Sequence, residues 1–189
     1  MRGTEDRNRR TPAARKEVFI RMRKITALLA GALALAAFAA PSAMAGNAHF
    51  IKNATSASLS GSSLVCRFKE AGLESGSVET VSCNATESIT YECVNGGGKN
   101  PSASNKHTFV THASKSGQFT ADRNGNIANS LTLSPASASS LGFSCPSGQT
   151  VTLVSVSYSN VSVADSTSGA SISIPGTFTY TNPSAPPVR

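Results

Sequence analysis

The chain has 189 residues, of which 14% are charged, and its formal net charge is +7 at pH 7. Nine of the 17 Lys and Arg residues lie within residues 1–45, so the rest of the chain has eight basic residues against seven acidic ones. This balance excludes a nucleic acid or an anionic membrane as a partner that bulk charge would select. Because 39% of the residues are hydrophobic, the chain is not an intrinsically disordered polar polymer.

The first 45 residues have the pattern of an export signal preceded by a polar extension. Arg23 and Lys24 precede an almost uninterrupted apolar run over residues 25–40, and small residues that a signal peptidase reads follow it. We predict a secretory signal peptide over residues 22–45 and no membrane span after its cleavage, because the run is shorter than the roughly 20 residues that a span needs. Residues 1–21 are interpreted as a misassigned N-terminal extension.

The rest of the chain is expected to form one domain over residues 46–180, followed by a flexible tail over 181–189. Apolar residues alternate with polar ones in short runs, which Gly, Ser, Asn and Pro clusters separate. The pattern predicts an all-β fold, a two-sheet antiparallel β-sandwich of immunoglobulin-like type with nine or ten short strands. The predicted strands are 49–57, 62–69, 77–84, 88–94, 107–113, 116–121, 127–134, 149–158, 160–165 and 171–180.

Two local patterns refine this prediction. The run 151–158 is the most hydrophobic strand, and we expect it to be central, with both faces covered. Residues 123–126 read Arg-Asn-Gly-Asn and predict a tight turn, because Asn-Gly tolerates the positive φ that such turns need.

The four cysteines are predicted to form two disulfides, because the protein is expected in an oxidising compartment. If strands 62–69 and 77–84 form a hairpin, Cys66 lies opposite Cys83, and a second hairpin turning at residues 85–86 leaves Cys93 to pair with Cys145. A zinc site is the alternative, but the cysteines are 17, 10 and 52 residues apart and lack paired Cys-x-x-Cys spacing.

The long segment over residues 95–106 is the candidate interaction loop, because loops of this length are functional or merely mobile. It lacks the spacing, and the following helix, of a phosphate-binding loop. Its first six residues are those we expect to contact a partner: Asn95, Gly96, Gly97, Gly98, Lys99 and Asn100.

No catalytic constellation is recognisable. Serines are too abundant to single one out, and His49, His107 and His112 show no spacing that assigns them to a triad. Five glutamates in the first half are interpreted as solvated groups on exposed strand faces and turns, and not as glycosidase carboxylates. These are Glu70, Glu74, Glu79, Glu87 and Glu92.

His49 supports one alternative, a copper-binding secreted oxidase. Cleavage after Ala48 would make His49 the N-terminal residue, and His107 or His112 would supply a second ligand. Cleavage after Ala45 is the better match to the small-residue rule and leaves His49 inside the first strand. We therefore predict no cofactor.

The chain resembles a group of small secreted proteins that is common in actinomycete-type bacteria and has no assigned activity. The resemblance covers most of residues 46–180, and it implies that Cys93 and Cys145 form the more constant pair, with Cys66 and Cys83 as an addition. It is carried by the segments 49–58, 68–73, 93–101, 144–149, 154–161 and 175–178.

Together these observations predict a secreted, extracellular, non-enzymatic β-sandwich that acts as an interaction or cell-envelope-associated module. Its expected partner is an extracellular protein or an envelope component of unknown identity, and not nucleic acid. A third hypothesis is an inhibitor of a secreted protease that presents the 95–106 loop, which Cys93 would hold rigid at its base.

Overall fold

A computed structural model describes residues 47–97 and 105–186 of the chain. These residues lie within one compact unit and form β-strands, two short 3-10 helices and connecting loops, without an α-helix. No helix in the described ranges is long and apolar enough to cross a bilayer. The predicted extension and signal peptide lie outside the described residues.

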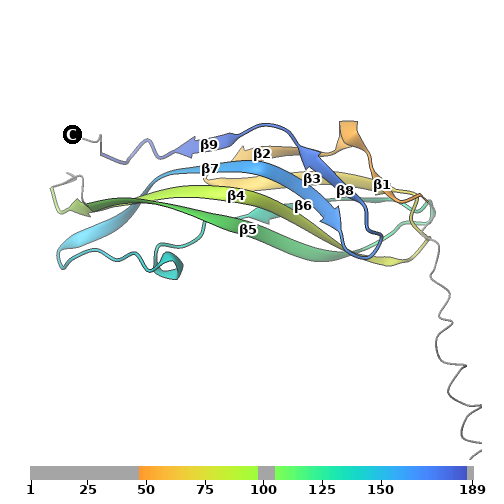
Figure 1. Ribbon diagram of the computed structural model, residues 1–189, viewed down its shortest axis with the longest axis horizontal. Coiled ribbons are helices and arrows are strands. Elements are labelled where there is room, and N and C mark those ends of the chain that lie inside the picture. The colour runs from red at the N-terminus through yellow and green to blue at the C-terminus, as the bar shows by residue number, and fades with distance from the viewer. Residues whose placement is uncertain (1–46, 98–104, 187–189) are drawn as a thin grey trace, which may run out of the picture. The chain divides into compact units, whose positions relative to one another are not determined.

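Nine strands in the described ranges form two antiparallel sheets, so the predicted two-sheet β-sandwich is confirmed (Figure 1). The smaller sheet contains β1 (His49–Phe50), β2 (Ser56–Ser60), β3 (Ser63–Ala71) and β6 (Ile127–Leu133). The larger sheet contains β4 (Val78–Asn95), β5 (Lys106–Thr120), β7 (Gln149–Asp165), β8 (Ser171–Ile174) and β9 (Phe178–Thr181).

The centre of each sheet is set by its longest strands. In the smaller sheet, β3 pairs with β1 and β2 along one edge and with β6 along the other. In the larger sheet, β4 lies between β5 and β7, and β7 pairs in turn with β8 and β9. Strands β5 and β6 are therefore edge strands, and they lie near each other on the same side of the sandwich.

Three pairs of predicted short strands are single long strands in the structure. β4 has 18 residues, β5 has 15 and β7 has 17. The predicted turn at residues 85–86 was wrong, because Ala85 is buried within β4 and pairs with Ala113 of β5. The predicted break between strands 149–158 and 160–165 is a β-bulge within β7. The register between β4 and β7 shifts there, beside Asn160, whose φ is +52°.

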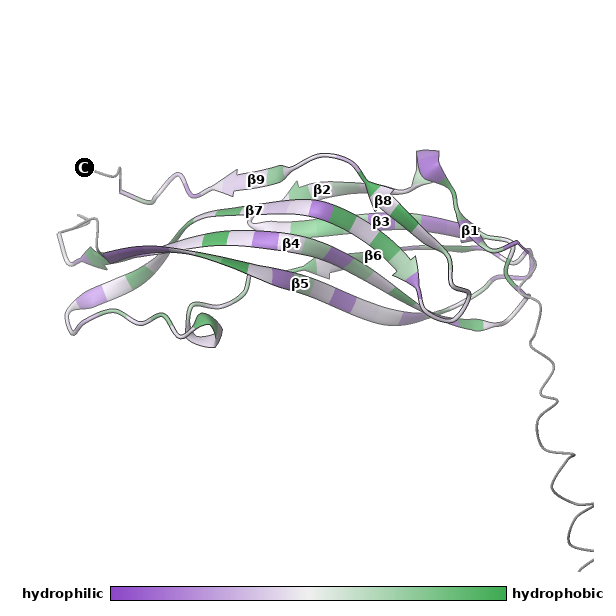
Figure 2. Cartoon of the chain, in the orientation of Figure 1, coloured by the Kyte–Doolittle hydropathy of each residue, from purple (hydrophilic) through white to green (hydrophobic). Residues whose placement is uncertain are grey.

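The core lies between the sheets and follows the period of two predicted for the strands. The fully buried side chains include Leu64 of β3, Ile89 of β4 and Val156 of β7. Figure 2 shows the resulting alternation of hydrophobic and hydrophilic residues along β4 and β7. β7 is central within its sheet, as predicted, but its burial alternates, so only one face is covered and not both.

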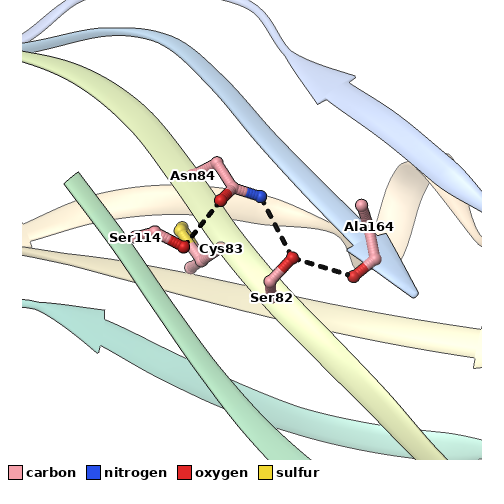
Figure 3. Close-up of a disulfide and its surroundings, with 6 residues drawn as sticks. Ser82, Cys83, Asn84, Ser114 and Ala164 are labelled. Carbon is pink, nitrogen blue, oxygen red and sulfur yellow. Dashed lines mark hydrogen bonds between the residues drawn. A yellow bond between two sulfur atoms is a disulfide. The ribbon is translucent and has the colours of Figure 1, made fainter. Parts of the chain in front are cut away.

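The outer face of the larger sheet carries a ladder of hydroxyl and amide groups. The Ser114 hydroxyl donates to Asn84 Oδ1 at 2.8 Å, Asn84 Nδ2 donates to Ser82 Oγ at 3.1 Å, and the Ser82 hydroxyl donates to Ala164 O at 3.2 Å (Figure 3). Hydrogen bonds across adjacent strands stabilise a sheet by a few tenths to about 1 kcal/mol each. This ladder gives part of the chain's serine content a structural role.

Both predicted disulfides form, and the hairpin argument for the first pair was wrong. Cys66 lies in β3 and Cys83 in β4, which belong to different sheets, so their bond links the two layers of the sandwich. Cys93 at the far end of β4 is bonded to Cys145 in the connection between β6 and β7. The predicted hairpin does not form, because β3 pairs with β1, β2 and β6 of the smaller sheet and not with β4.

The chain continues in regular structure slightly past the predicted domain end. Thr181 is the last residue of β9, and Asn182 donates its backbone N–H to Val154 O at 2.8 Å. The side-chain amide of Asn182 donates to Leu153 O at 2.8 Å. These two residues of the predicted flexible tail are thus hydrogen-bonded to β7.

We expect Gly125→Ala to destabilise the protein more than Gly76→Ala. Both glycines have a positive φ, +70° and +79°, so both substitutions strain the backbone by about 1–2 kcal/mol. A Cβ at Gly125 would lie 2.2 Å from Leu73 O, whereas nothing lies within 4 Å of a Cβ at Gly76. The loss of unfolding free energy in urea should exceed that of Gly76→Ala by at least about 1 kcal/mol. Equal losses would show that the turn around Gly125 moves freely away from Leu73.

Candidate functional site

The larger sheet extends beyond the smaller one, and residues 134–148 cover the excess. We call this connection between β6 and β7 the covering segment; it includes the 3-10 helix η3 (Ser139–Leu141). It passes under the ends of β4 and β5 (Figure 1). Ala138, Leu141 and Phe143 pack against the hydrophobic core. The inward face of the larger sheet is thus shielded by a second sheet at one end and by a loop at the other.

The covering segment is held at Ala136 by two side chains of β4. The Ala136 N–H donates to the Glu87 carboxylate at 3.2 and 3.3 Å from the two oxygens, and the Tyr91 hydroxyl donates to Ala136 O at 2.7 Å. Only 1% of Glu87 is exposed. Burial raises the pKa of Glu87, and burial with the nearby Glu87 charge raises the pKa of Tyr91.

An aromatic cluster and a disulfide fix the remainder of the covering segment. The Phe143 ring lies 6.2 Å from that of Tyr91, 6.0 Å from Phe109 and 5.5 Å from His107, measured between ring centres. The bond between Cys93 and Cys145 links the covering segment to β4, the strand that also carries Glu87 and Tyr91. The covering segment is therefore attached at its start by hydrogen bonds and further along by packing and a covalent link.

A groove of about 350 Å³ opens where β5 and the end of β6 diverge. We call it the edge groove. Glu87 lies among its lining residues, together with parts of β5, of β6 and of the covering segment. The lining residues are Glu87, Thr111, His112, Ala113, Ser114, Lys115, Thr132, Leu133, Ser134 and Ala136.

The edge groove combines open backbone with a basic rim. Within the described residues, β5 pairs only with β4 and β6 only with β3, so the outer edge of each strand has no strand partner. Lys115 and His112 line the groove from β5, whereas β6 has no charged residue. The groove can therefore offer unpaired peptide groups and a cation to an extended chain.

The predicted interaction loop is only partly described. Asn95 is the last residue of β4, and its side-chain oxygen accepts the Gly97 N–H at 3.1 Å. Gly96 and Gly97 begin a turn. Gly98, Lys99 and Asn100 lie outside the described residues, so the loop stays a prediction.

The three histidines that the sequence singled out are divided between the two sheets. His49 is exposed in β1, where its Nδ1 lies 2.7 Å from Asn47 O, and His107 and His112 lie in β5. Asp122 accepts the N–H groups of Asn124 and Asn126 in the predicted turn, and these bonds lower its pKa. Among the described residues, no group of three or more His, Cys, Asp or Glu side chains is placed to hold a metal ion.

Sequence reasoning missed that four of the five glutamates are buried, because it interpreted all of them as solvated. Glu70, Glu79 and Glu92 are 0%, 4% and 0% exposed, and only Glu74 lies on the surface as expected. The alternation of apolar and polar residues along each strand could have indicated that these glutamates are buried. Glu70 shares the parity of the apolar side of β3, and Glu79 shares that of β4, so both point between the sheets.

A second groove of about 350 Å³ lies beside the bulge in β7, near the break between β8 and β9. It is lined by Asn160, Val161, Ser162, Ser173, Ile174, Pro175 and Gly176. None of these side chains titrates near neutral pH. The edge groove is the stronger candidate site, because its lining includes the carboxyl group of Glu87 and the ammonium group of Lys115.

Comparison with known proteins adds little to this description. No protein-family model matches the chain, and no curated protein matches it. Among solved structures it is similar to the solution structure of R. palustris CsgH, with 10% sequence identity over 71% of this chain and 91% of that one. The TM-score of 0.19 marks a likeness too distant to bear on fold or function.

We expect Tyr91→Phe to loosen the covering segment. The substitution removes the donor to Ala136 O and keeps the ring against Phe143, so the free energy of unfolding should fall by about 1 kcal/mol. That loss corresponds to a melting temperature lower by about 2–4 °C. Tyr180→Phe in β9, a half-buried tyrosine away from the covering segment, is the matched control and should change stability less. Equal effects would mean that the hydroxyl of Tyr91 does not hold the segment.

Proposed function

We propose that the protein is an extracellular binding module that recognises an extended segment of a partner chain at the edge groove. The observation that carries this proposal is the pair of strand edges, β5 and β6, that flank the groove and lack strand partners among the described residues. Backbone groups at such edges bind extended peptides by strand addition, and nearby pockets then select side chains.

Charge favours a partner with acidic side chains. β5 carries two lysines and two histidines and no acidic residue, and Lys115 lies in the groove lining. The one carboxylate in the lining, that of Glu87, already accepts the Ala136 N–H. A lysine on an edge strand disfavours pairing with a second copy, because the two lysine-bearing edges would repel each other. The same lysine attracts a chain of opposite charge.

The extracellular location is supported by the two disulfides, which persist in oxidising compartments. It agrees with the signal peptide that the sequence predicts. A binding role without catalysis is supported by the placement of His49 in one sheet and of His107 and His112 in the other. The resemblance to small secreted actinomycete-type proteins is part of this proposal and adds no activity to it.

We expect the edge groove to prefer acidic extended peptides. The probes are two fluorescein-labelled decapeptides, one that alternates Val with Glu and one that alternates Val with Lys. Fluorescence polarisation should show binding of the acidic peptide, and Lys115→Glu should weaken it at least tenfold. Lys52→Glu, which reverses an exposed lysine of the 3-10 helix η1 (Lys52–Ala54), is the control and should leave binding unchanged.

Strand addition is tested separately on the ligand. An acidic peptide with N-methyl groups at alternate residues loses backbone donors and keeps its charge, so its binding should be lost. Backbone NMR shifts induced by the unmodified peptide should concentrate in residues 111–115 and 132–136, which line the groove. Shifts elsewhere, or no binding of either peptide, would contradict the proposal.

A further inference from the structure

A second feature, at the opposite end of the sandwich from the covering segment, goes beyond the proposed binding function. Three carboxyl groups meet there, and we call them the carboxyl corner. Glu70 comes from the end of β3 in the smaller sheet, Glu79 from the start of β4, and Asp165 from the end of β7 in the larger sheet. Their exposed fractions are 0%, 4% and 2%.

Each carboxyl group of the corner has one bonded oxygen and one that lacks a partner. The Ser168 hydroxyl donates to Glu70 Oε1 at 2.8 Å, the Ser77 hydroxyl donates to Glu79 Oε1 at 2.5 Å, and the Thr167 N–H donates to Asp165 Oδ1 at 2.8 Å. The second oxygens are buried and have no hydrogen-bond partner in the described part of the chain. These atoms are Glu70 Oε2, Glu79 Oε2 and Asp165 Oδ2.

Asp165 lies close to both glutamates. It pairs with Val81, two residues from Glu79 on the same side of β4, and its charge raises the pKa of Glu70 and of Glu79. Ionised carboxylates only accept hydrogen bonds, so a bond between two of them requires that one carries a proton. A buried carboxylate oxygen that lacks both a proton and a hydrogen-bond donor is strongly unfavourable, so protonation of the glutamates is the natural solution here.

The charged groups on the adjoining elements do not neutralise the corner. β1 contributes His49, which is exposed beside Asn47 O, and the turn after β5 contributes Asp122, which Lys69 of β3 attracts. β6, β8 and the 166–170 loop carry no charged residue. The charges that act on Glu70 are those of Asp165 and Glu79, and both raise its pKa.

We propose that the carboxyl corner is a proton-dependent latch: protons on Glu70 and Glu79, which lie beside Asp165, hold the end of the smaller sheet against the larger one, and their loss loosens this end. Once the protons leave, the carboxylates repel one another between β3 of the smaller sheet and β4 and β7 of the larger one. A metal ion is the other means of neutralising such a cluster, but the described residues offer no metal-binding arrangement.

The direction of the pH dependence follows from the buried carboxyl groups. Burial raises the pKa of Glu70 from 4.5 to about 7, opposed by the Ser168 bond and reinforced by the charge of Asp165, and burial also raises the pKa of Glu79. A raised pKa means that the folded protein binds more protons than the unfolded one. The contribution of Glu70 to stability is complete below pH 4.5 and is lost as the pH rises through about 7.

Thermal unfolding at pH 5 and pH 8 tests the latch. We expect the wild-type melting temperature to fall by at least about 5 °C between these values. Glu70→Gln keeps the shape of the side chain and removes the titration, so it should melt above the wild type at pH 8 and lose at least half of the pH dependence. Glu74→Gln, an exposed glutamate nearby in sequence, is the matched control and should behave as the wild type. A variant that melts lower by the same amount at both pH values would overturn the proposal.

Two measurements on the wild type keep the test independent of any variant. The side-chain carboxyl ¹³C signal of Glu70 should titrate near pH 7, and a midpoint near 4.5 would overturn the latch. Hydrogen exchange, corrected for its intrinsic pH dependence, should speed up at pH 8 for the Ser166 amide, which donates to Thr80 O at the corner. It should not do so for the Asn182 amide at the other end of β7.

Added calcium separates a proton latch from a metal centre. If 1 mM calcium chloride raises the wild-type melting temperature at pH 8 by several degrees but leaves that of Glu70→Gln unchanged, the corner is a metal site and the proposal is wrong. No calcium effect, with the pH dependence above, supports the latch. Neither outcome depends on peptide binding at the edge groove, so the two proposals stand or fall separately.

Discussion

The central constraint on this protein is the need to cover one face of three long strands. β4, β5 and β7 have 15 to 18 residues, whereas the longest strand of the smaller sheet has nine. An apolar sheet face must be removed from water, and a loop that covers it must have its peptide groups bonded. The covering segment meets both needs, through Phe143 on the aromatic cluster and through the Ala136 peptide between Glu87 and Tyr91. The edge groove lies where this loop replaces a strand.

The buried acids of the sandwich are stabilised in two different ways. Glu87 receives a backbone N–H from Ala136, and the Tyr158 hydroxyl, whose pKa is raised by its own burial and by the Glu87 charge, lies beside it. The carboxyl corner instead has three acids whose second oxygens find no donor among the described residues. The donors bonded to Glu87 lower its pKa against the larger effect of its burial, whereas the charges of Asp165 and Glu79 add to the effect of burial on the pKa of Glu70. One fold therefore holds a fixed polar anchor and a proton-sensitive contact on the same strand, β4.

These features assign different tasks to the two ends of the sandwich. The covering segment, with its disulfide from Cys93 to Cys145, fixes the backbone that borders the proposed binding groove. A rigid border lowers the conformational entropy that the protein itself loses when a partner binds. The opposite end relies on the Cys66–Cys83 bond between the sheets and on the carboxyl corner. Since a covalent link persists when the protons leave, loosening of the corner stays local and need not unfold the sandwich.

Much of the architecture could be predicted from residues that are close in sequence. Alternation along 62–69 and 77–84 indicated strands with one buried side, and Asn124-Gly125 indicated the turn at which Gly125 has a φ of +70°. The same alternation placed Glu70 and Glu79 on inward faces, although their charge led to the opposite interpretation. A charged residue type is therefore no proof of an exposed position, because a neighbouring element can supply a hydrogen-bond donor to a buried carboxyl group.

The sequence by itself determined the all-β class, the strand faces and the presence of two disulfides, because period-two patterns and cysteine pairing are local or compositional properties. Only the tertiary structure decided which strands are neighbours. Ala85 does not form a turn, because β4 continues through this residue and pairs there with β5. Cys66 bonds to Cys83 across the sandwich, because β3 pairs with β6 and not with β4. Register and sheet membership depend on the total area buried when all strands assemble, and no single segment contains that information.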